Sequence, residues 1–510
     1  MTARLIVHNV RVFTMEPSRP SAEAVAVAGD RLLAVGSEAW VARHRSPETR
    51  LVDGRGRALL PGFIDAHCHL LSYAASLLSI DCSPRAVRSI ADIRAAVAAA
   101  AARTPEGRWL RAVGYDETDL AEGRHPTRRD LDAAAPRHAV RLLHRTGRAC
   151  VLNSLAMSLV GLSAASEEPA GGYMERESAT GEPTGLLLEM NDVVDPFVPP
   201  LAYDELSAGV RQTAKVLLSE GVTALQDATA TNGRQEWELF RRLIADGCLP
   251  LSVTLMEGYD RLGELPGGDE TLPLRRGPVK LVISELGEEV HPGPEELAEM
   301  VWRVHESGRQ AAIHAVGEAA VAAAAEALDG ALRRRPRRDH RHRVEHCGVC
   351  PPAPARRLAG LGVIVVTQPS FIYHNGDRYL RQVPAKDLPH LYPLRTLREA
   401  GVPLAAGSDA PVAPPGVLTG LVGAVRRLSS SGAAVSPEQA ISVEEALAMH
   451  TRAAAHAAFE EGERGILRAG KRADLVLLSG DPLSGVAVES LRVEMTVAGG
   501  EIAWQREEAG

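Results

Sequence analysis

Residues of the types that bind metal ions recur along this chain, each at or just after a short apolar run. His67 and His69 come first, at the end of the run 60–66. The later members, each after its own aliphatic run, are Lys280, His314, His346 and Asp409. Short apolar runs are typical of buried strands, and a catalytic zinc site takes imidazole and carboxylate ligands, which a barrel delivers from the ends of successive strands. The order of these residues therefore predicts metal-dependent chemistry.

The pair His67 and His69 is the most informative part of this pattern. Side chains alternate along a strand, so residues two apart present their imidazoles on the same face. Such a pair is a preformed chelate for one ion, although in isolation it is more often a chance occurrence at the surface. Because further residues of ligand type follow later strands, we interpret the whole set as one metal site.

The later histidines and the aspartate each allow a simpler interpretation. His314 and His346 would add two neutral imidazoles, but a lone histidine after a strand is more often a satisfied core residue. Asp409 lies in the turn 407–411, and we predict that it both touches the ion and takes a proton from the attacking water. Its alternative role is a helix cap or an Asx-turn.

Lys280 is the ambiguous member of the set, because a protonated amine repels a metal ion. It can act as a ligand only as an uncharged amine or after carbamylation of its nitrogen. Carbamylation requires a lowered amine pKa, which burial beside cations favours. The alternative is a buried lysine paired with an acid such as Glu285.

Composition places the chain among ordinary globular proteins. Of its 510 residues, 45% are hydrophobic and 24% are charged, and the net charge of −8 gives no reason to expect nucleic acid or an anionic membrane as a partner. Its six cysteines lack the spacing of a disulfide framework. Cys347 and Cys350 form a single CxxC motif, which without a second such motif is a weak indication of a zinc site. We find no sequence pattern of a signal peptide or a membrane span, so we expect a cytoplasmic protein.

Two strand-rich ends flank a region in which strands and helices alternate. Segments 4–59 and 474–504 consist of short strands and turns, and neither has enough apolar surface to fold alone, so we pair them in one small β-sandwich. The alternation between them predicts an α/β fold with a (β/α)8 TIM barrel. The predicted domains are sandwich parts at 1–60 and 457–510, and a barrel at 61–456 with an insertion at about 72–198.

The barrel elements are predicted from apolar runs and from helical periodicity. The segments predicted as strands after the first are 222–225, 251–255, 279–283, 310–313, 343–345, 363–366 and 404–406. The segments predicted as helices are 89–103, 203–220, 236–246, 294–307, 319–333 and 443–458. With the run before His67 as the first strand, the strands reach the number that closes a barrel.

Taken together, these residues resemble the amidohydrolase superfamily, and within it the amidohydrolase-3 branch that includes N-substituted formamide deformylases. The resemblance runs from about Leu5 to Trp504. Besides the residues of ligand type, the motifs that carry it lie at 114–116, 126–132, 153–154, 183–185, 221–223, 314–317, 341–346, 368–369, 407–411 and 470–474. The resemblance implies a metal-bearing (β/α)8 barrel with a small β-sandwich made from both chain ends.

The resemblance also implies how the ligands would be divided. A carbamylated Lys280 would bridge two ions. The two-ion arrangement places His67, His69 and Asp409 on one ion and His314 and His346 on the other. With an unmodified Lys280, a single ion would be held by His67, His69, His314 and Asp409. His346 would then orient the water or the substrate oxyanion.

Three positions depart from the pattern of the branch. Glu285 lies in a stretch where the branch usually has Asp-Gly, Arg148 stands where it often has histidine, and Glu318 stands where it commonly has aspartate. The stretch around Glu285 faces the site in this architecture, so we expect a different substrate preference. Arg148 would contact an acidic substrate group or simply be exposed, and the role of Glu318 is open.

The predicted function is metal-dependent hydrolysis of an amide-type C–N bond in a small molecule, an N-acyl or N-formyl amine rather than a peptide. Asp409, His346 and Lys280 are the predicted catalytic residues, with one or two divalent ions, zinc first, as the cofactor. One alternative is a ring deaminase or cyclic-amide hydrolase on the same barrel. The other is a catalytically silent binding protein, which the full set of ligand-type residues disfavours. A homodimer is left open.

Overall fold

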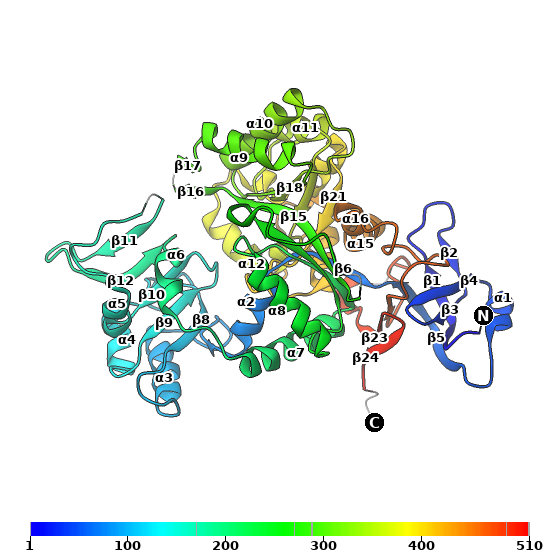
Figure 1. Ribbon diagram of the computed structural model, residues 1–510, viewed down its shortest axis with the longest axis horizontal. Helices are drawn as coiled ribbons and strands as arrows, with labels where there is room; N and C mark the ends of the chain where they lie inside the picture. The colour runs from blue at the N-terminus through cyan, green and yellow to red at the C-terminus, as the bar shows by residue number, and fades with distance from the viewer. Residues whose placement is uncertain (1, 170, 270, 287–288, 486, 508–510) are drawn as a thin grey trace. The chain divides into compact units, whose positions relative to one another are not determined.

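A parallel sheet of eight strands is the central element of the computed structural model (Figure 1). The structure describes residues 2–169, 171–269, 271–286, 289–485 and 487–507. In pairing order, the strands are β6 (Phe63–Cys68), β13 (Val222–Asp227), β14 (Ser252–Gly258), β15 (Leu274–Val282), β18 (Ala311–Ala315), β19 (Arg343–His346), β20 (Ile364–Thr367) and β21 (Leu404–Ala406). Each predicted strand overlaps one of these, and the predicted α/β barrel is confirmed.

Backbone hydrogen bonds join the first and last strands of this sheet. The amide of Asp409 donates to the carbonyl of His67 (N···O 2.7 Å), and the amide of His69 donates to the carbonyl of Ala410 (2.8 Å). These bonds lie at the carboxyl ends of β6 and β21, where the sheet closes on itself. The barrel is therefore nearly complete, and its seam runs between residues that the sequence assigned to the metal site.

Helices that follow the strands pack their apolar sides on the sheet. Val301 and Leu328, on α9 (Pro294–Glu306) and α10 (Glu318–Arg334), are fully buried and share one core with Val279 and Ile313 of the sheet. Burying a side chain of this size contributes about 1.5–3 kcal/mol. Further helices of the barrel are α8 (Arg234–Ala245), α11 (Pro352–Gly360), α12 (Ser370–Gln382) and α13 (Leu394–Ala400).

The segment 443–458, predicted as one helix, is two helices. The helices α15 (Val443–Met449) and α16 (Arg452–Ala457) are separated at His450 and Thr451. Thr451 has φ −130° and ψ −101°, which is not helical, and the carbonyl of His450 accepts a hydrogen bond from the amide of Ile64 (2.8 Å). The break frees this carbonyl for the first strand of the barrel, a long-range contact that local helical periodicity does not reveal.

The two chain ends form one sheet, as predicted. Its strands pair in the order β24 (Glu501–Gln505), β23 (Val493–Ala498), β22 (Leu475–Leu478), β5 (Arg50–Pro61), β1 (Leu5–Phe13), β3 (Ala24–Ala28) and β4 (Arg31–Gly36), with β2 (Ser21–Ala22) on β1. Val7 and Leu475, from opposite ends of the chain, are buried in the same core. A hairpin at Gly499 and Gly500 joins β23 and β24, and both glycines have positive φ (54° and 84°), the conformation that a tight hairpin turn requires.

The chain divides into two compact units, one of Met1–His69 with Ala214–Gly510 and the other of Leu70–Thr213. The second unit has its own sheet, whose strands pair in the order β11 (Tyr173–Arg176), β12 (Pro183–Leu188), β10 (Ala149–Leu152), β9 (Val140–His144), β8 (Leu110–Tyr115) and β7 (Ile80–Asp81). The strands β7, β8 and β9 are parallel and the others antiparallel. The sequence-based domain boundaries stay a prediction.

Helices complete the core of the second unit. The helix α3 (Ile90–Ala101) was predicted, and it begins where the side chain of Ser89 accepts a hydrogen bond from the backbone amide of Asp92. Ile93 on α3, with Leu131 on α4 (Arg128–Ala134), packs against Leu142 of the sheet. This unit therefore contains a hydrophobic core of its own.

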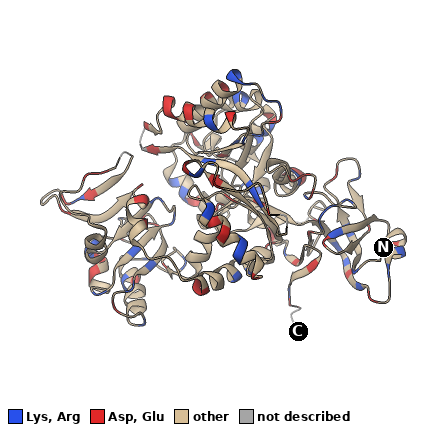
Figure 2. Ribbon diagram, in the orientation of Figure 1, with Lys and Arg blue, Asp and Glu red and all other residues tan. Residues whose placement is uncertain are grey.

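Charged side chains of both signs are interspersed along the ribbon (Figure 2). On the outer helices they form ion pairs, such as Arg333 with Asp329 (3.1 Å) and Arg357 with the same carboxylate (3.2 Å). Pairs of this exposed kind contribute about 0–1 kcal/mol each. Within the described residues, no helix has the length and apolar character needed to cross a membrane.

Candidate functional site

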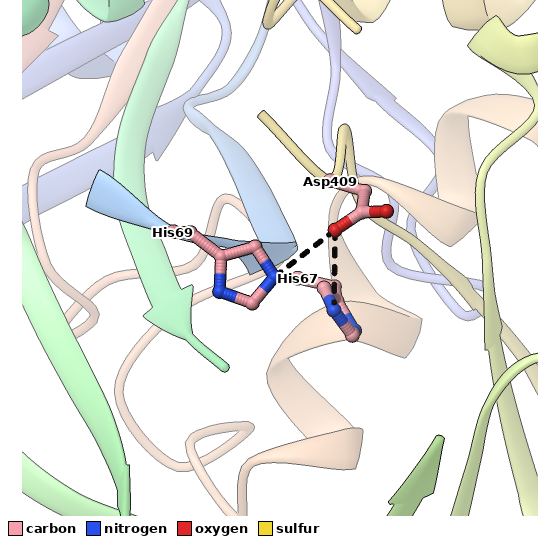
Figure 3. Close-up of side chains that lie close together, drawn as sticks. All are labelled: His67, His69 and Asp409. Atoms are coloured by element: carbon pink, nitrogen blue, oxygen red, sulfur yellow. Dashed lines mark ion pairs between the residues drawn. The ribbon is translucent and has the colours of Figure 1, made fainter. Parts of the chain in front are cut away.

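Two imidazoles and one carboxylate converge at the carboxyl ends of the barrel strands (Figure 3). The Nε2 atom of His69 lies 3.1 Å from Oδ1 of Asp409, and Nε2 of His67 lies 3.5 Å from the same oxygen. Ligand atoms about 2.0–2.1 Å from a tetrahedral zinc ion are about 3.3 Å apart, so these separations fit one ion. His67 and Asp409 are buried, whereas the side chain of His69 is 25% exposed, which leaves the cluster open to solvent on that side.

A buried aspartate holds the two segments of this cluster in register. Asp65, two residues before His67, accepts hydrogen bonds from the amide and the hydroxyl of Ser408 (2.9 and 2.6 Å) and from the amide of His67 (3.2 Å). Burial raises the pKa of Asp65 to about 6, although these hydrogen bonds oppose the rise. Gly407 completes the arrangement, because a Cβ there would lie 2.4 Å from the backbone nitrogen of His67.

The second ring nitrogen of each of three histidines is held from outside the cluster. Nδ1 of His67 bonds to the carboxylate of Glu345, and Nδ1 of His346 lies 2.8 Å from Oε1 of Gln368. Nδ1 of His69 lies 3.1 Å from Oγ1 of Thr229. Carboxylate and amide oxygens accept hydrogen bonds, so the protons of the His67 and His346 rings occupy Nδ1 and their lone pairs lie on Nε2, whereas the hydroxyl of Thr229 can accept from His69 or donate to it. This is the arrangement that orients imidazoles toward a metal ion.

Glu345 belongs to a buried charge network that motif analysis did not assign to the site. Its carboxylate accepts from Nε and Nη2 of Arg343 (2.7 and 3.0 Å), and both side chains are fully buried. Arg343 also donates to the carbonyl of Ala66 (2.9 Å) and to the side chain of Gln226. The period-two alternation of β19, which puts Arg343 and Glu345 on one face, was the available signal. The partner, His67, is 278 residues away in the sequence.

Lys280 lies beside the cluster, but its predicted alternative partner does not. Its Nζ is 3.5 Å from Nε2 of His67 and is buried. Burial lowers the pKa of Lys280 to about 8, and the negative charges of Glu345 and Asp409 oppose the decrease. Pairing with Glu285 is wrong, because that carboxylate accepts from the amides at the start of α10, namely Gly317 (2.8 Å) and Ala320 (3.1 Å).

The two later histidines complete a contiguous group. The ring centroids of His314 and His346 are 4.3 Å apart, and those of His67 and His346 are 4.8 Å apart. Nε2 of His346 is buried and makes no hydrogen bond within the part of the chain that the structure describes. His346 and Asp409 both have positive φ (70° and 57°), a conformation that costs energy outside glycine and is concentrated at functional sites. The structure thus brings all the predicted site residues together.

Burial sets the protonation of this group. Burial lowers the pKa of His67 well below its usual value, with the charge of Lys280 acting in the same direction, and burial likewise lowers the pKa of His346. Burial alone would raise the pKa of Asp409, but the hydrogen bond to His69 and the neighbouring imidazoles lower it overall. Neutral imidazoles beside an ionised carboxylate are the protonation states in which these residues bind a divalent cation.

Arg148 and Glu318, which depart from the branch pattern, have local environments of their own. Nε of Arg148 is 3.2 Å from a carboxylate oxygen of Glu189. Glu318 is exposed in the first turn of α10, where an acidic side chain favours the positive end of the helix dipole. Cys347 and Cys350 are buried free thiols.

The sequence profile of the amidohydrolase family, in its third subgroup, matches residues 50–503. The chain belongs to this family. It is 29% identical to the N-substituted formamide deformylase of Arthrobacter pascens, with 98% of each chain covered. Among solved structures, a metal-dependent hydrolase from Pyrococcus furiosus superposes with a TM-score of 0.71 at 24% identity, covering 94% of this chain and 99% of that one. A second, from Pyrococcus horikoshii OT3, gives a TM-score of 0.74 at 20% identity, with 94% and 98% covered.

These comparisons define the class of reaction. As a member of the amidohydrolase family, the chain is a hydrolytic enzyme acting on carbon–nitrogen bonds. The cluster of His67, His69 and Asp409 supplies two nitrogen ligands and one oxygen ligand within 4.8 Å of one another, a set that fits a divalent metal ion.

Proposed function

We propose that this enzyme hydrolyses the amide bond of an N-acyl or N-formyl amine of small size, outside peptides. The observation that carries the proposal is the convergence of Nε2 of His67, Nε2 of His69 and Oδ1 of Asp409, with each ring oriented by a partner behind it. We further propose zinc at this position, because two imidazoles and a carboxylate with open positions form a typical catalytic zinc set.

The residues around this position have separate tasks. A bound zinc ion lowers the pKa of a water molecule and polarises the substrate carbonyl. Asp409, ionised and buried, accepts the proton of the attacking water and returns it to the nitrogen of the leaving amine. His346 presents the lone pair of Nε2, since its Nδ1 proton is donated to Gln368. His346 therefore orients the water by accepting a hydrogen bond. This role is favoured over its other predicted role, donation of a hydrogen bond to the substrate oxyanion.

Lys280 determines how many ions the site holds. In the one-ion form, which the compact group of His67, His69 and Asp409 supports, Lys280 stays an amine. In the two-ion form its carbamate would bridge to a second ion on His314 and His346. The lowered pKa of about 8 favours the uncharged amine that carbamylation needs. The number of zinc ions lost when His67, His69, His314 and His346 are all replaced by alanine, measured with and without added bicarbonate, decides between the forms: one ion in the first form and two in the second.

The ring-deaminase alternative has little structural support. A deaminase on this barrel needs an acid close to the His314 side chain to protonate the substrate ring. Glu318, the acid that follows His314 in the sequence, is exposed at the start of α10. The geometry therefore favours acyl-amine hydrolysis.

A substrate panel tests the proposal. The enzyme is incubated with N-formyl amines, N-acyl amino acids, esters and lactams, and separately with amino-substituted purines, pyrimidines and triazines. We expect release of amine from the formyl or acyl compounds, with loss of that release in Asp409→Asn. Ammonia release from the ring compounds, with none from the acyl amines, would contradict the proposal.

A further inference from the structure

A second cluster of metal-ligand side chains lies in the unit formed by Leu70–Thr213. β8 ends at Tyr115 and β9 ends at His144, the two strands are parallel neighbours, and Tyr115 pairs with His144. Asp116 and Glu117 follow Tyr115 directly, so they lie at the same sheet edge as His144. The carboxyl edge of parallel strands is where α/β sheets commonly bind ligands.

The contact between Glu117 and His144 is unusual for a buried pair. Oε2 of Glu117 lies 3.0 Å from Nε2 of His144. Both atoms are shielded from solvent, and neither makes a well-aligned hydrogen bond to any of the described residues. The side chain of His144 is 90% buried, with 10% exposed. Burial removes the hydration of this carboxylate oxygen and this imidazole nitrogen. Without an aligned proton between them, no hydrogen bond compensates for that loss.

Neighbouring residues hold the ligands from behind. Nδ1 of His144 lies 2.8 Å from Oγ1 of Thr146, whose oxygen also accepts from the amide of Arg148 (3.3 Å). With its proton on Nδ1, donated to this oxygen, the ring has its lone pair on Nε2, facing Glu117, and this is the tautomer that a bound ion requires. In the other tautomer Nδ1 accepts from the amide of Thr146 (3.3 Å) and Nε2 carries the proton. Asp116 accepts from the amide and hydroxyl of Thr118 (3.0 and 2.7 Å) and from Nε of Arg145 (2.6 Å). This fixation resembles the outer partners of metal ligands.

The charges of the cluster also suit a cation. When no ion is bound and Nε2 of His144 carries the proton, its contact with Glu117 lowers the pKa of that carboxyl. The bonds from Thr118 and Arg145 lower the pKa of Asp116, although burial opposes both shifts and is the largest single influence on Asp116. Both carboxyl groups are therefore ionised, while Arg145 balances one of the two negative charges. Nδ1 of His125 lies 3.7 Å from Glu117, and burial lowers the pKa of that imidazole, so a neutral ring is close to the cluster.

We propose that Asp116, Glu117 and His144 bind a divalent transition-metal ion, at a site independent of the one in the barrel. Their ligand atoms lie within 4.8 Å of one another. The 3.0 Å between Glu117 and His144 is close to the separation of about 3.3 Å between two ligands of a tetrahedral ion. One imidazole and two carboxylates suit Zn²⁺ or Mn²⁺. The competing arrangement is a doubly protonated His144 paired with Glu117, without an ion.

Zinc binding to the full-length protein tests the site. The barrel site is first removed by replacing His67, His69, His314 and His346 with alanine, so that neither the one-ion nor the two-ion form remains. The chelator-treated protein is then titrated with Zn²⁺ by calorimetry, with bound zinc counted by elemental analysis. We expect one ion per chain to remain. Adding Glu117→Gln or His144→Gln should remove it or weaken its binding at least ~100-fold, more than the 10–100-fold typical of an outer partner.

Matched variants separate ligation from a general change of charge. Glu175→Gln removes a carboxylate of the same unit that bonds to the hydroxyl of Thr184 (Oγ1 to Oε2 2.6 Å), and it should keep the ion. Thr146→Val removes the partner of Nδ1 and should weaken binding ~10–100-fold. If the variant that lacks the barrel histidines fails to fold, the comparison is made without it. His144→Gln alone should then bind one ion fewer per chain than the unaltered protein. Absence of the ion, or its retention in both His144→Gln and Glu117→Gln, overturns the proposal.

Discussion

The two histidine–carboxylate clusters of this molecule lie at the same kind of position but are built differently. In the barrel, ligand-type residues come from five strands and from segments hundreds of residues apart, whereas in the unit of Leu70–Thr213 they come from two neighbouring strands. His67, His69 and His346 of the barrel each have their own outer partner. In the smaller cluster Asp116 is already paired with Arg145.

This difference indicates different tasks. The barrel cluster has a half-open side at His69 and an ionised acid, Asp409, beside it, which together permit a substrate to approach and a proton to be transferred. The cluster of Asp116, Glu117 and His144 is buried to a similar extent, but the arginine beside it reduces its negative charge. We therefore expect the first to be catalytic and the second to bind an ion that stabilises its unit.

Replacing the acid of the barrel cluster should have the largest effect. Asp409→Asn keeps the size of the side chain but cannot take a proton, so kcat for acyl-amine hydrolysis should decrease on the order of 10⁴-fold. Steady-state kinetics measure it, and Glu318→Gln, at the exposed start of α10, is the control with unchanged activity. Activity in Asp409→Asn within tenfold of the unaltered enzyme would remove the distinction between the two clusters.

Removing the water-orienting imidazole should have the next largest effect. His346→Ala should retain the zinc of His67, His69 and Asp409 but lower turnover ~10²–10³-fold, the usual loss for one positioned polar group. Zinc content and kcat are measured on the same preparation. Loss of the ion together with activity would instead identify His346 as a metal ligand and favour the two-ion form.

The buried partner of His67 should have an intermediate effect. Glu345→Gln leaves a neutral acceptor beside Nδ1 and an unpaired Arg343, so zinc affinity should decrease ~10–100-fold. Competition with a fluorescent chelator measures the affinity, and a melting curve checks that the fold persists. An unchanged affinity would mean that the outer partners of the barrel ligands contribute no more to metal binding than Arg145 contributes beside Asp116 in the smaller cluster.

The exposed histidine should show the smallest effect. Thr229→Val removes the oxygen 3.1 Å from Nδ1 of His69, and zinc affinity should decrease by about tenfold, the lower end for an outer partner. Because His69 is partly exposed, water can replace the lost acceptor. The same chelator competition measures the affinity. A loss as large as that in Glu345→Gln would show that the effect of an outer partner on zinc affinity does not depend on how buried the ligand is.

Local sequence patterns predicted the barrel and brought out the candidate ligand residues because both depend on short-range rules. Strand runs are read from apolar residues, and the ligand types that follow them can be read one by one. The orienting role of Glu345 could not be read in this way, because its partner His67 is 278 residues distant. The same reason explains the error over Glu285, whose true partners are amides of α10, and the unpredicted break at His450, whose carbonyl serves β6.

The buried Asp65 ties the first strand of the barrel to the segment after the last, across 343 residues of sequence. Contacts of such separation form late in folding, since the entropy of closing a long loop must be offset before they contribute. His67 and Asp409 flank this contact and meet only when it forms. During synthesis, the first ligand pair therefore waits for almost the whole chain to emerge, and the barrel metal site is one of the last parts of the molecule to assemble.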